Sequence, residues 1–478
     1  MLKMIFAKLS YSHYLSLFLS LTILSQSAMA QSVLEISVPE LVPKSVRQND
    51  QLSLESVSTA HRWGRAADLE KSKRKAYDLE MLLGLASQNN PTIRQARLQI
   101  SGTLAQAQQA GFYPNPTLAY LAENINSGGT PGEFQGAELE QRIVTADKLA
   151  LSRNKYLQRA KVAEHLAVAQ QFKVCNDVRI HFIQTLAAQD ILALRHEMLK
   201  TAQDQMVTTK ELFNLGQANQ VDLRKAVADL RRHQLDVLAA ENKVRQQFYT
   251  LTSLVGVELV PGRLEGSLET HCGMIDFDSA YATVLVESPE LLAAYAKLKE
   301  DHITVHRENV EWVPDIVVSG GSGYNFESQD PVANFSVRLE VPLYERNQGT
   351  IRQAQADEHR QRQEIRRIEM LLRMKLSEQY DTYITALQKV ETYNETILPE
   401  SKKAYEQSLI SYKNNREEWP VVLNDHREYT MRRMEQIDNH LKKRSAEILI
   451  NGYLLNGGLD AAPSPTPPGH IDSTPKPR

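Results

Sequence analysis

Long hydrophobic runs are missing from this sequence of 478 residues. A helix that crosses a bilayer needs about 20 predominantly apolar residues, and the longest apolar run, at 14–24, has only about 11. The sequence therefore excludes a bundle of membrane-spanning helices. It does not exclude membrane-spanning strands, which need only about 10 residues of alternating polarity and give a weak hydropathy signal.

Strong net charge and abundant cysteine are also missing. The formal net charge is −3, which argues against a nucleic-acid partner or a strongly basic patch for a membrane surface. Only two cysteines are present, Cys175 and Cys272, and they could pair or remain free. Neither lies within residues 1–30, so a lipid-anchoring cysteine at an N-terminal cleavage site is absent.

Catalytic motifs are missing as well. His196 and Glu197 have no second histidine at the metalloprotease spacing, and GGSG at 320–323 lacks the Lys-Ser/Thr pair of a phosphate-binding loop. His302 and His306 are four residues apart on an expected helix and could chelate a metal, but no carboxylate or cysteine completes the set. We therefore predict no enzyme activity, no cofactor and no metal site.

The N-terminus carries the pattern of a cleavable signal peptide. Lys3 and Lys8 precede the apolar run at 14–24, and the small residues Ala28 and Ala30 follow it. This order predicts cleavage after Ala30 and export of the mature chain. The alternative, a membrane anchor, would need a longer apolar run.

Proline and glycine are absent from two long stretches, 147–213 and 350–398. The first stretch, some 67 residues, corresponds to a helix of roughly 100 Å. The second should kink at Pro399 and then continue to Tyr412. In both stretches apolar residues recur at spacings of three and four, which is typical of coiled coils.

The sequence pattern indicates two copies of one structural unit. Pro114 and Glu140 in the first half have counterparts in Pro314 and Glu340, which are separated by the same interval in the second half. The period of about 200 residues is too long for a solenoid and indicates a duplicated half-molecule. The expected divisions are a signal peptide (1–30), a flexible segment (31–75), a first repeat (76–256), a linker (257–275), a second repeat (276–457) and a Pro-rich tail (458–478).

Each copy is expected to hold one pair of strands. The expected strands are 118–123 and 134–144, joined at 126–132, and 315–326 and 334–343, joined at 327–331. In the last strand, Phe335, Val337, Leu339, Val341 and Leu343 alternate with Ser336, Arg338 and Glu340. Four strands separated in pairs by long helices cannot bury a core alone, so we expect strand partners from other chains.

The long helices are expected to turn back at two tips. Gly216 suits the left-handed residue that ends a helix, and Asn219 suits the cap of the next helix. In the second copy Asn415 stands at the glycine position, and asparagine also tolerates the left-handed region. Pro420 is expected to disturb this second tip.

These features together resemble the TolC-like outer-membrane efflux proteins. The resemblance covers about 77–457, and its motifs are GFYPNPTL (111–118), FNLGQANQVDL (213–223) and LEVPLYERNQG (339–349). It implies a mainly α fold with a transmembrane β part, in which each chain gives four strands to a trimeric 12-stranded outer-membrane β-barrel and long helical hairpins form a periplasmic tunnel. It also implies a homotrimer in outer-membrane lipid, with a periplasmic adaptor protein and an inner-membrane transporter as partners.

By matched position, the resemblance assigns the helix tips to a periplasmic gate and to adaptor docking. The assigned residues are Phe213, Gly216, Asn219 and Asp222 in the first tip, and Tyr412, Asn415, Glu417, Asn424 and Asp425 in the second. Asp222 is expected about one and a half turns into the returning helix, where it could reach a neighbouring tip. Glu417, Val421 and Asn424 replace charged residues of the family gate, so its ring of charge is altered.

The same resemblance places prolines where the helical tunnel becomes the barrel. These are Pro114, Pro116, Pro314 and Pro342. The expected function is a passive exit duct for small molecules or metal ions, the outer component of a tripartite efflux system. A conduit for type I protein secretion and a periplasmic coiled-coil scaffold are the alternatives. The sequence does not identify the substrate, because a wide duct takes its specificity from the pump.

Overall fold

The structure is a computed structural model that describes residues 76–125, 133–269, 273–414 and 416–466. Several sequence predictions fall outside these ranges. They are the signal peptide, the segment 31–75, the turn at 126–132, Cys272, Asn415 and the last part of the Pro-rich tail, 467–478.

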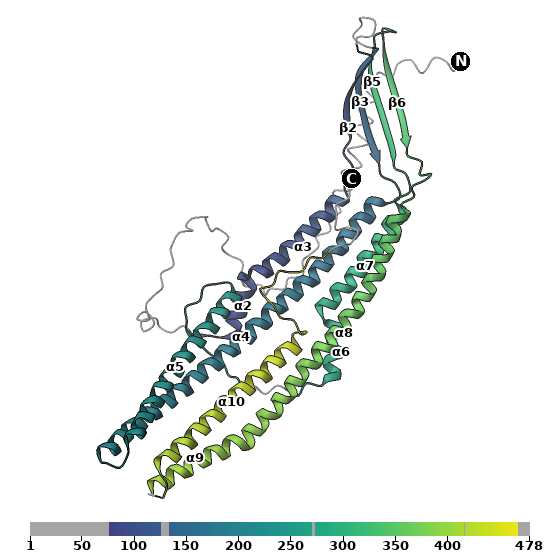
Figure 1. The fold of residues 1–478 in the computed structure, drawn as a ribbon. Coiled ribbons are helices and arrows are strands. Elements are labelled where there is room, and N and C mark those ends of the chain that lie inside the picture. The colour runs from purple at the N-terminus through teal and green to yellow at the C-terminus, as the bar shows by residue number, and fades with distance from the viewer. Residues whose placement is uncertain (1–75, 126–132, 270–272, 415, 467–478) are drawn as a thin grey trace. The chain divides into compact units, whose positions relative to one another are not determined.

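The described residues form the elements labelled in Figure 1. In chain order they are β1 (Ala76–Tyr77), α2 (Leu79–Asn89), α3 (Pro91–Ala110), β2 (Thr117–Glu123), β3 (Phe134–Ile143), α4 (Lys148–Asn214), α5 (Gln220–Val255), β4 (Arg263–Leu264), α6 (Phe277–Glu287), α7 (Pro289–Val310), β5 (Ile316–Asn325), β6 (Asp330–Leu339), α8 (Gln348–Thr392), the π-helical turn η3 (Tyr393–Ile397), α9 (Leu398–Lys413) and α10 (Trp419–Asn451). None of these helices combines the length and the apolar content needed to cross a membrane.

The order of elements in the first half of the chain recurs in the second half. α3 and α7 begin at Pro91 and Pro289, and α4 and α8 begin at Lys148 and Gln348. Both long helices start after a residue with positive φ, Asp147 at 53° and Asn347 at 58°. Non-glycine residues seldom adopt this conformation, so its recurrence at the same place in both halves supports a duplication.

The two long helical stretches differ in continuity. α4 runs unbroken for 67 residues, as the absence of proline and glycine predicts. The second stretch is interrupted by η3, which stands between α8 and α9. The interruption lies just before Pro399, where the sequence predicts a kink. Proline has no N–H to donate, and its ring crowds the carbonyl four residues back, which opens the helix locally.

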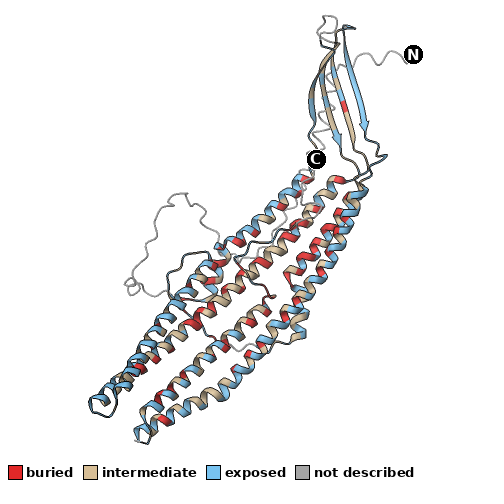
Figure 2. Cartoon of the chain, viewed as in Figure 1, coloured by how far each residue is buried: buried red, intermediate tan, exposed pale blue. Residues whose placement is uncertain are grey.

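Two apolar clusters hold the helices together. One joins α2, α4, α5 and β4, with Leu82, Val174 and Leu251 at its centre. The other joins α6, α7, α8 and α10, with Leu372 and Leu376 at its centre. Figure 2 shows that buried residues gather on the helices, while β6 is exposed along its whole length.

Segments expected to be linker and tail also make defined contacts. Leu264 and Leu268, between the two repeats, are buried in the first cluster. Beyond the second repeat, the carbonyl of Gly458 accepts hydrogen bonds from Gln170 Nε2 (3.0 Å) and Thr92 Oγ1 (2.8 Å). Both segments therefore help to fix the middle of α4 against its neighbours.

The four longer strands form one antiparallel sheet in the order β2-β3-β5-β6. The first hairpin matches the sequence prediction to within one residue at each end. The prediction for the last strand was wrong, because β6 spans Asp330–Leu339 and not 334–343. Its turn is shorter than expected, with Gln329 in the left-handed region at φ 59°. Glu340, Val341 and Leu343 therefore lie beyond the strand.

Candidate gate and strand–helix junction

The first helix tip is a tight, well-bonded turn between α4 and α5. Gly216 adopts φ 73°, as its sequence position predicts. Its N–H donates to the Phe213 carbonyl at 3.0 Å, and the Gln217 N–H donates to the Leu212 carbonyl at 2.8 Å. This pair of bonds is a Schellman motif, which satisfies the last carbonyls of a helix and requires a left-handed residue.

α5 begins with a capping box. Asn219 Oδ1 accepts the N–H of Asp222 at 2.9 Å, and Asp222 Oδ2 accepts the N–H of Asn219 at 3.3 Å. The predicted position of Asp222 was wrong, because α5 starts at Gln220 and Asp222 lies in its first turn. In the described chain its carboxylate therefore has a partner within its own tip.

Apolar side chains are exposed around the first tip. Phe213 lies in the last turn of α4, and Leu215 and Val221 lie on either side of the turn. Leu215 is 71% exposed and Val221 is 57% exposed. Apolar side chains are therefore accessible on both sides of this turn.

The second tip lacks a side-chain cap. α9 ends at Lys413, and α10 begins at Trp419 without a backbone N–H donating to the side chain of Glu418. The Tyr412 and Trp419 rings pack with centroids 4.9 Å apart. Pro420 lies in the first turn of α10, where its missing N–H costs nothing, so it does not interrupt that helix; its expected effect on the tip stays a prediction.

The remaining predicted residues of the second tip lie on both sides of it. Glu417 is half-buried in the connection before α10. Asn424 is exposed on α10, whereas the neighbouring Asp425 accepts a hydrogen bond from Ser408 of α9. The structure therefore brings Asp425 into the α9–α10 contact and leaves Asn424 at the surface.

An ionic contact that the sequence analysis missed joins the two hairpins. Glu197 of α4 lies 3.0 Å from Arg433 Nη1 and 3.4 Å from His426 Nε2, both in α10. The partners belong to different halves of the chain, so no local sequence pattern could connect them. This contact links the first hairpin to the second above their tips.

The predicted prolines lie in the connections between helices and strands. Pro114 and Pro116 lie between α3 and β2, Pro314 between α7 and β5, and Pro342 between β6 and α8. The carbonyl of Pro114 accepts from Gln141 Nε2 (3.0 Å), and that of Pro314 accepts from Thr145 Oγ1 (2.7 Å). Pro114, Pro116 and Pro314 follow the ends of helices and Pro342 follows the end of β6, so none of them occupies a position where a ladder N–H is needed.

Asp315 forms the most strongly bonded part of this junction. Its carboxylate accepts from Lys148 Nζ at 2.9 Å, the Thr145 N–H at 3.2 Å and Arg142 Nη2 at 2.6 Å. Burial of the carboxyl opposes its ionisation, but these hydrogen bonds outweigh burial and lower the pKa of Asp315. The cluster ties the start of β5 to the first turn of α4.

The two faces of the sheet differ in polarity. Residues directly opposite each other in antiparallel strands share a face, and the register aligns Leu118, Leu139, Gly320 and Phe335 across all four strands. Large exposed apolar side chains on this face are Leu118, Tyr120, Leu139, Ile143, Phe335, Val337 and Leu339. The opposite face carries Thr117, Glu138, Glu140, Arg142, Ser319, Asn334, Ser336 and Arg338.

Polar contacts cross this second face. Arg338 forms an ion pair with Glu140, and Ser319 Oγ lies 2.8 Å from Ser336 Oγ. One face of the sheet is therefore suited to an apolar environment, and the other to water.

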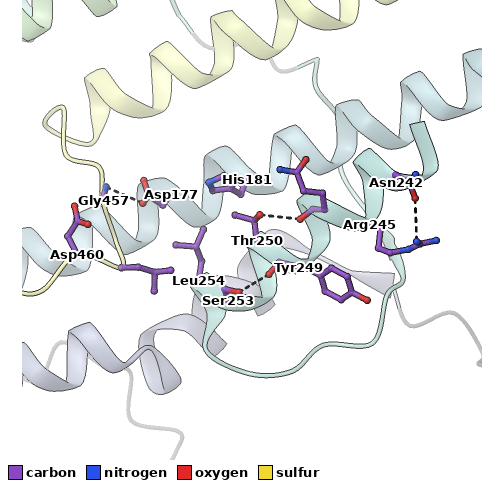
Figure 3. Close-up of a pocket in the computed structure, with 12 residues that line it drawn as sticks. Asp177, His181, Asn242, Arg245, Tyr249, Thr250, Ser253, Leu254, Gly457 and Asp460 are labelled. Atoms are coloured by element: carbon purple, nitrogen blue, oxygen red, sulfur yellow. Dashed lines mark hydrogen bonds between the residues drawn. The ribbon is translucent and has the colours of Figure 1, made fainter. Parts of the chain in front are cut away.

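An open hollow of about 660 Å³ lies between α4, α5 and the segment after α10 (Figure 3). At one end of it, Asp177 accepts the N–H groups of Gly457 (3.1 Å) and Gly458 (2.7 Å). Burial raises the pKa of Asp177 despite these bonds. Thr250 and Ser253 donate to carbonyls of their own helix, so the polar side chains of the hollow are largely used in holding the segment and α5 in place.

The described residues show no cluster of three or more His, Cys, Asp and Glu side chains placed to hold a metal ion. Burial also raises the pKa of the half-buried Cys175 thiol, which makes it a poorer nucleophile and metal ligand.

Comparisons with known proteins agree with this architecture. Residues 82–257, which span α2 to the end of α5, match the family model of the outer membrane efflux proteins. The cobalt-zinc-cadmium resistance protein CzcC of Cupriavidus metallidurans is 23% identical over 361 residues, which are 73% of this chain and 83% of CzcC. The nickel-cobalt-cadmium resistance protein NccC of Alcaligenes xylosoxydans xylosoxydans is 22% identical over 300 residues, 59% of this chain and 64% of NccC.

Solved structures show the same fold. CusC aligns with a TM-score of 0.66 and 15% identity over 87% of this chain and 100% of CusC. The outer membrane protein VceC of Vibrio cholerae aligns with a TM-score of 0.64 and 14% identity over 80% of this chain and 96% of VceC. The family match over residues 82–257, the relatives along most of the chain and the TolC-like fold together confirm the resemblance to the outer membrane efflux proteins.

Proposed function

We propose that the chain is the outer-membrane channel of a tripartite efflux system, in which three copies form a passive exit duct. Proteins of this family work as trimeric channels with an adaptor and an inner-membrane transporter. The observation that carries the proposal is the four-stranded sheet, with one apolar and one polar face and with β2 and β6 as its edges.

Open sheet edges favour closure by further copies of the same sheet. An edge strand presents unpaired backbone groups, and in lipid each such group costs several kcal/mol, so a membrane sheet has to close. Pairing of β6 of one chain with β2 of the next would remove both edges. The apolar face would then meet lipid, and Glu138, Glu140 and Arg338 would line the water-filled interior.

The helices would continue this duct towards the inner membrane. The tips at Gly216 and between α9 and α10 would form its far end. The exposed Phe213, Leu215 and Val221 would supply the apolar contact for a periplasmic adaptor. The Glu197 contact with Arg433 would hold the two hairpins of one chain together and so favour the closed state.

Cysteine cross-linking between strands tests the closure. With Cys175 and Cys272 replaced by serine, single cysteines are placed along β2 and along β6, and the paired variants are oxidised in outer-membrane fractions. We expect covalent dimers and trimers from at least one β2–β6 register. Cysteines at Ala137 of β3 and Ser322 of β5, which face each other inside one chain, should give only intramolecular links.

Two results would contradict this proposal. One is that no β2–β6 cysteine pair forms a cross-link between chains, although the control pair at Ala137 and Ser322 forms its disulfide at the same protein level. The other is recovery of the chain mainly as a soluble periplasmic species, which is the behaviour of a scaffold that never enters the outer membrane.

We further propose divalent metal ions as cargo. The support is the pair of relatives named for resistance to cobalt, zinc, cadmium and nickel. The test is growth on graded Co²⁺, Zn²⁺ and Cd²⁺ of a host that expresses the chain with a metal-exporting adaptor and pump. Loss of the chain should raise cellular metal and sensitivity, whereas unchanged metal content with altered antibiotic sensitivity would contradict metal cargo.

A further inference from the structure

Two histidines of α7 form a surface pair that neither the sheet nor the tips use. His302 and His306 are four residues apart, so their side chains project from the same face of the helix. Both are exposed in the chain. Their Nε2 atoms are 3.2 Å apart, and their rings lie edge to face with centroids 4.7 Å apart. Two ring nitrogens therefore lie next to each other at the surface.

The separation of the nitrogens fits a shared metal ion. Zinc and similar ions lie about 2.0–2.1 Å from a histidine nitrogen. Two such bonds hold the nitrogens about 2.9 Å apart at a right angle and about 3.3 Å apart at a tetrahedral angle. The observed 3.2 Å lies inside this range. Imidazole nitrogen is also a preferred ligand of Zn²⁺, Ni²⁺ and Cu²⁺.

A carboxylate on the neighbouring helix faces the other nitrogen of His302. Glu358 of α8 places Oε1 3.6 Å from His302 Nδ1, and its side chain is only 12% exposed. Arg362 anchors this carboxylate by donating to Oε1 at 2.7 Å. Histidines that bind metals commonly turn their second nitrogen towards a carboxylate, which favours the tautomer with a free ligating nitrogen. A different helix thus supplies a carboxylate beside His302, as a partner of its Nδ1 and not as a third metal ligand.

We propose that His302 and His306 chelate one divalent transition-metal ion through their Nε2 atoms, with Glu358 orienting His302. The chain supplies two direct ligands, because the described residues hold no larger cluster, and water fills the other positions. A site with open positions differs from a closed structural site and exchanges its ion readily. The proposal concerns binding to this pair, and its test does not depend on which cargo the duct carries.

Metal binding by the purified full-length mature protein tests the pair. The protein carries a tag without histidine, and Ni²⁺ binding is measured at neutral pH by equilibrium dialysis and calorimetry. The wild type should bind one more Ni²⁺ per chain than the His302→Gln/His306→Gln variant. Glu358→Gln should lower the affinity of the site for this Ni²⁺ ion by about 10- to 100-fold. With Cu²⁺, electron paramagnetic resonance should show two nitrogen ligands that the double variant loses.

His196→Gln is the matched control. His196 is also exposed on a helix, but it has no histidine one turn away, so its replacement should leave the extra ion in place. Circular dichroism of all variants checks that the helices are intact. A hydrogen bond between the two rings, without metal affinity, would give equal Ni²⁺ binding in the wild type and the double variant. That result, or an equal loss in His196→Gln, would overturn the proposal.

Discussion

Replacing Asp315 by asparagine removes one negative charge from the strand–helix junction with little change of shape. The carboxylate is 7% exposed, and its partner Lys148 is 9% exposed. The variant therefore leaves a nearly buried ammonium group. In the described chain, the other hydrogen-bond acceptor of Lys148 Nζ is the Val313 carbonyl, at 2.5 Å. Asparagine retains an oxygen for the Thr145 N–H, so the main loss is the ionic contact with Lys148.

The magnitude follows from the burial of each partner. Removing one member of a buried ion pair costs about 3–5 kcal/mol. The retained bond to Thr145 reduces this cost, and Arg142, which is 53% exposed, contributes only about 0–1 kcal/mol. We expect Asp315→Asn to lower the free energy of unfolding by about 2–4 kcal/mol. Replacing both partners, with Asp315→Leu and Lys148→Met, should recover most of this loss.

Denaturant unfolding of the purified protein in detergent, at one fixed protein concentration, measures these differences. Arg142→Gln is the matched control and should cost less than about 1 kcal/mol. The reasoning fails if Asp315→Asn is no more destabilising than Arg142→Gln. It also fails if the double variant is less stable than Asp315→Asn alone.

The same carboxyl predicts a dependence on pH. Its pKa in the folded protein is below the ordinary value of 3.8, so the unfolded chain binds the proton more readily. The stabilisation is therefore complete above about pH 3.8 and is lost as the pH falls through the lower, folded-state pKa. The wild type should lose stability in this acid range, whereas Asp315→Asn should show a smaller loss.

Three further predictions concern the sheet, the first tip and the lower helices. Val337→Lys places a cation on the apolar face at a cost of about 2–4 kcal/mol, so its yield in the outer membrane should fall well below that of Arg338→Lys; equal yields would contradict the assignment of faces. Gly216→Val forces a β-branched residue into the left-handed region at a cost of at least about 1–2 kcal/mol. It should weaken cross-linking to an adaptor while trimers still form, and loss of trimers would contradict the placing of Gly216 at the tip. Burial lowers the pKa of His440, so its contribution to stability is present above about pH 6.5 and declines as the pH falls; His440→Phe should lose less stability on acidification, as followed by circular dichroism.

The sequence predicted features that depend on local chemistry. The absence of proline and glycine marked α4 to within one residue at each end. The left-handed Gly216 and the cap at Asn219 could likewise be predicted, because only a few residue types favour the left-handed conformation or cap the start of a helix. The short helices α2 and α6 were not singled out, although Asp78 and Asp276 cap them through their side chains.

Contacts between distant segments could not be predicted in the same way. Asp315 meets Lys148 across 167 residues, and Glu197 meets Arg433 across 236. Each contact depends on which helix faces pack together, and one sequence does not specify this. The start of β6 was also misplaced. The expected turn at 327–331 included Pro331, but proline is tolerated on an edge strand, and β6 is an edge of the sheet.

The π-helical turn before Pro399 makes the two hairpins mechanically unequal. α4 is one uninterrupted rod, whereas its counterpart in the second repeat has a joint at Tyr393–Ile397. An interrupted hydrogen-bond ladder bends at lower cost than a regular one. Under the same sideways force on the tips, the first hairpin would therefore bend less than the second. In a ring of three chains, stiff first hairpins and compliant second hairpins would alternate. The second hairpins would then take up more of any widening at the helix tips.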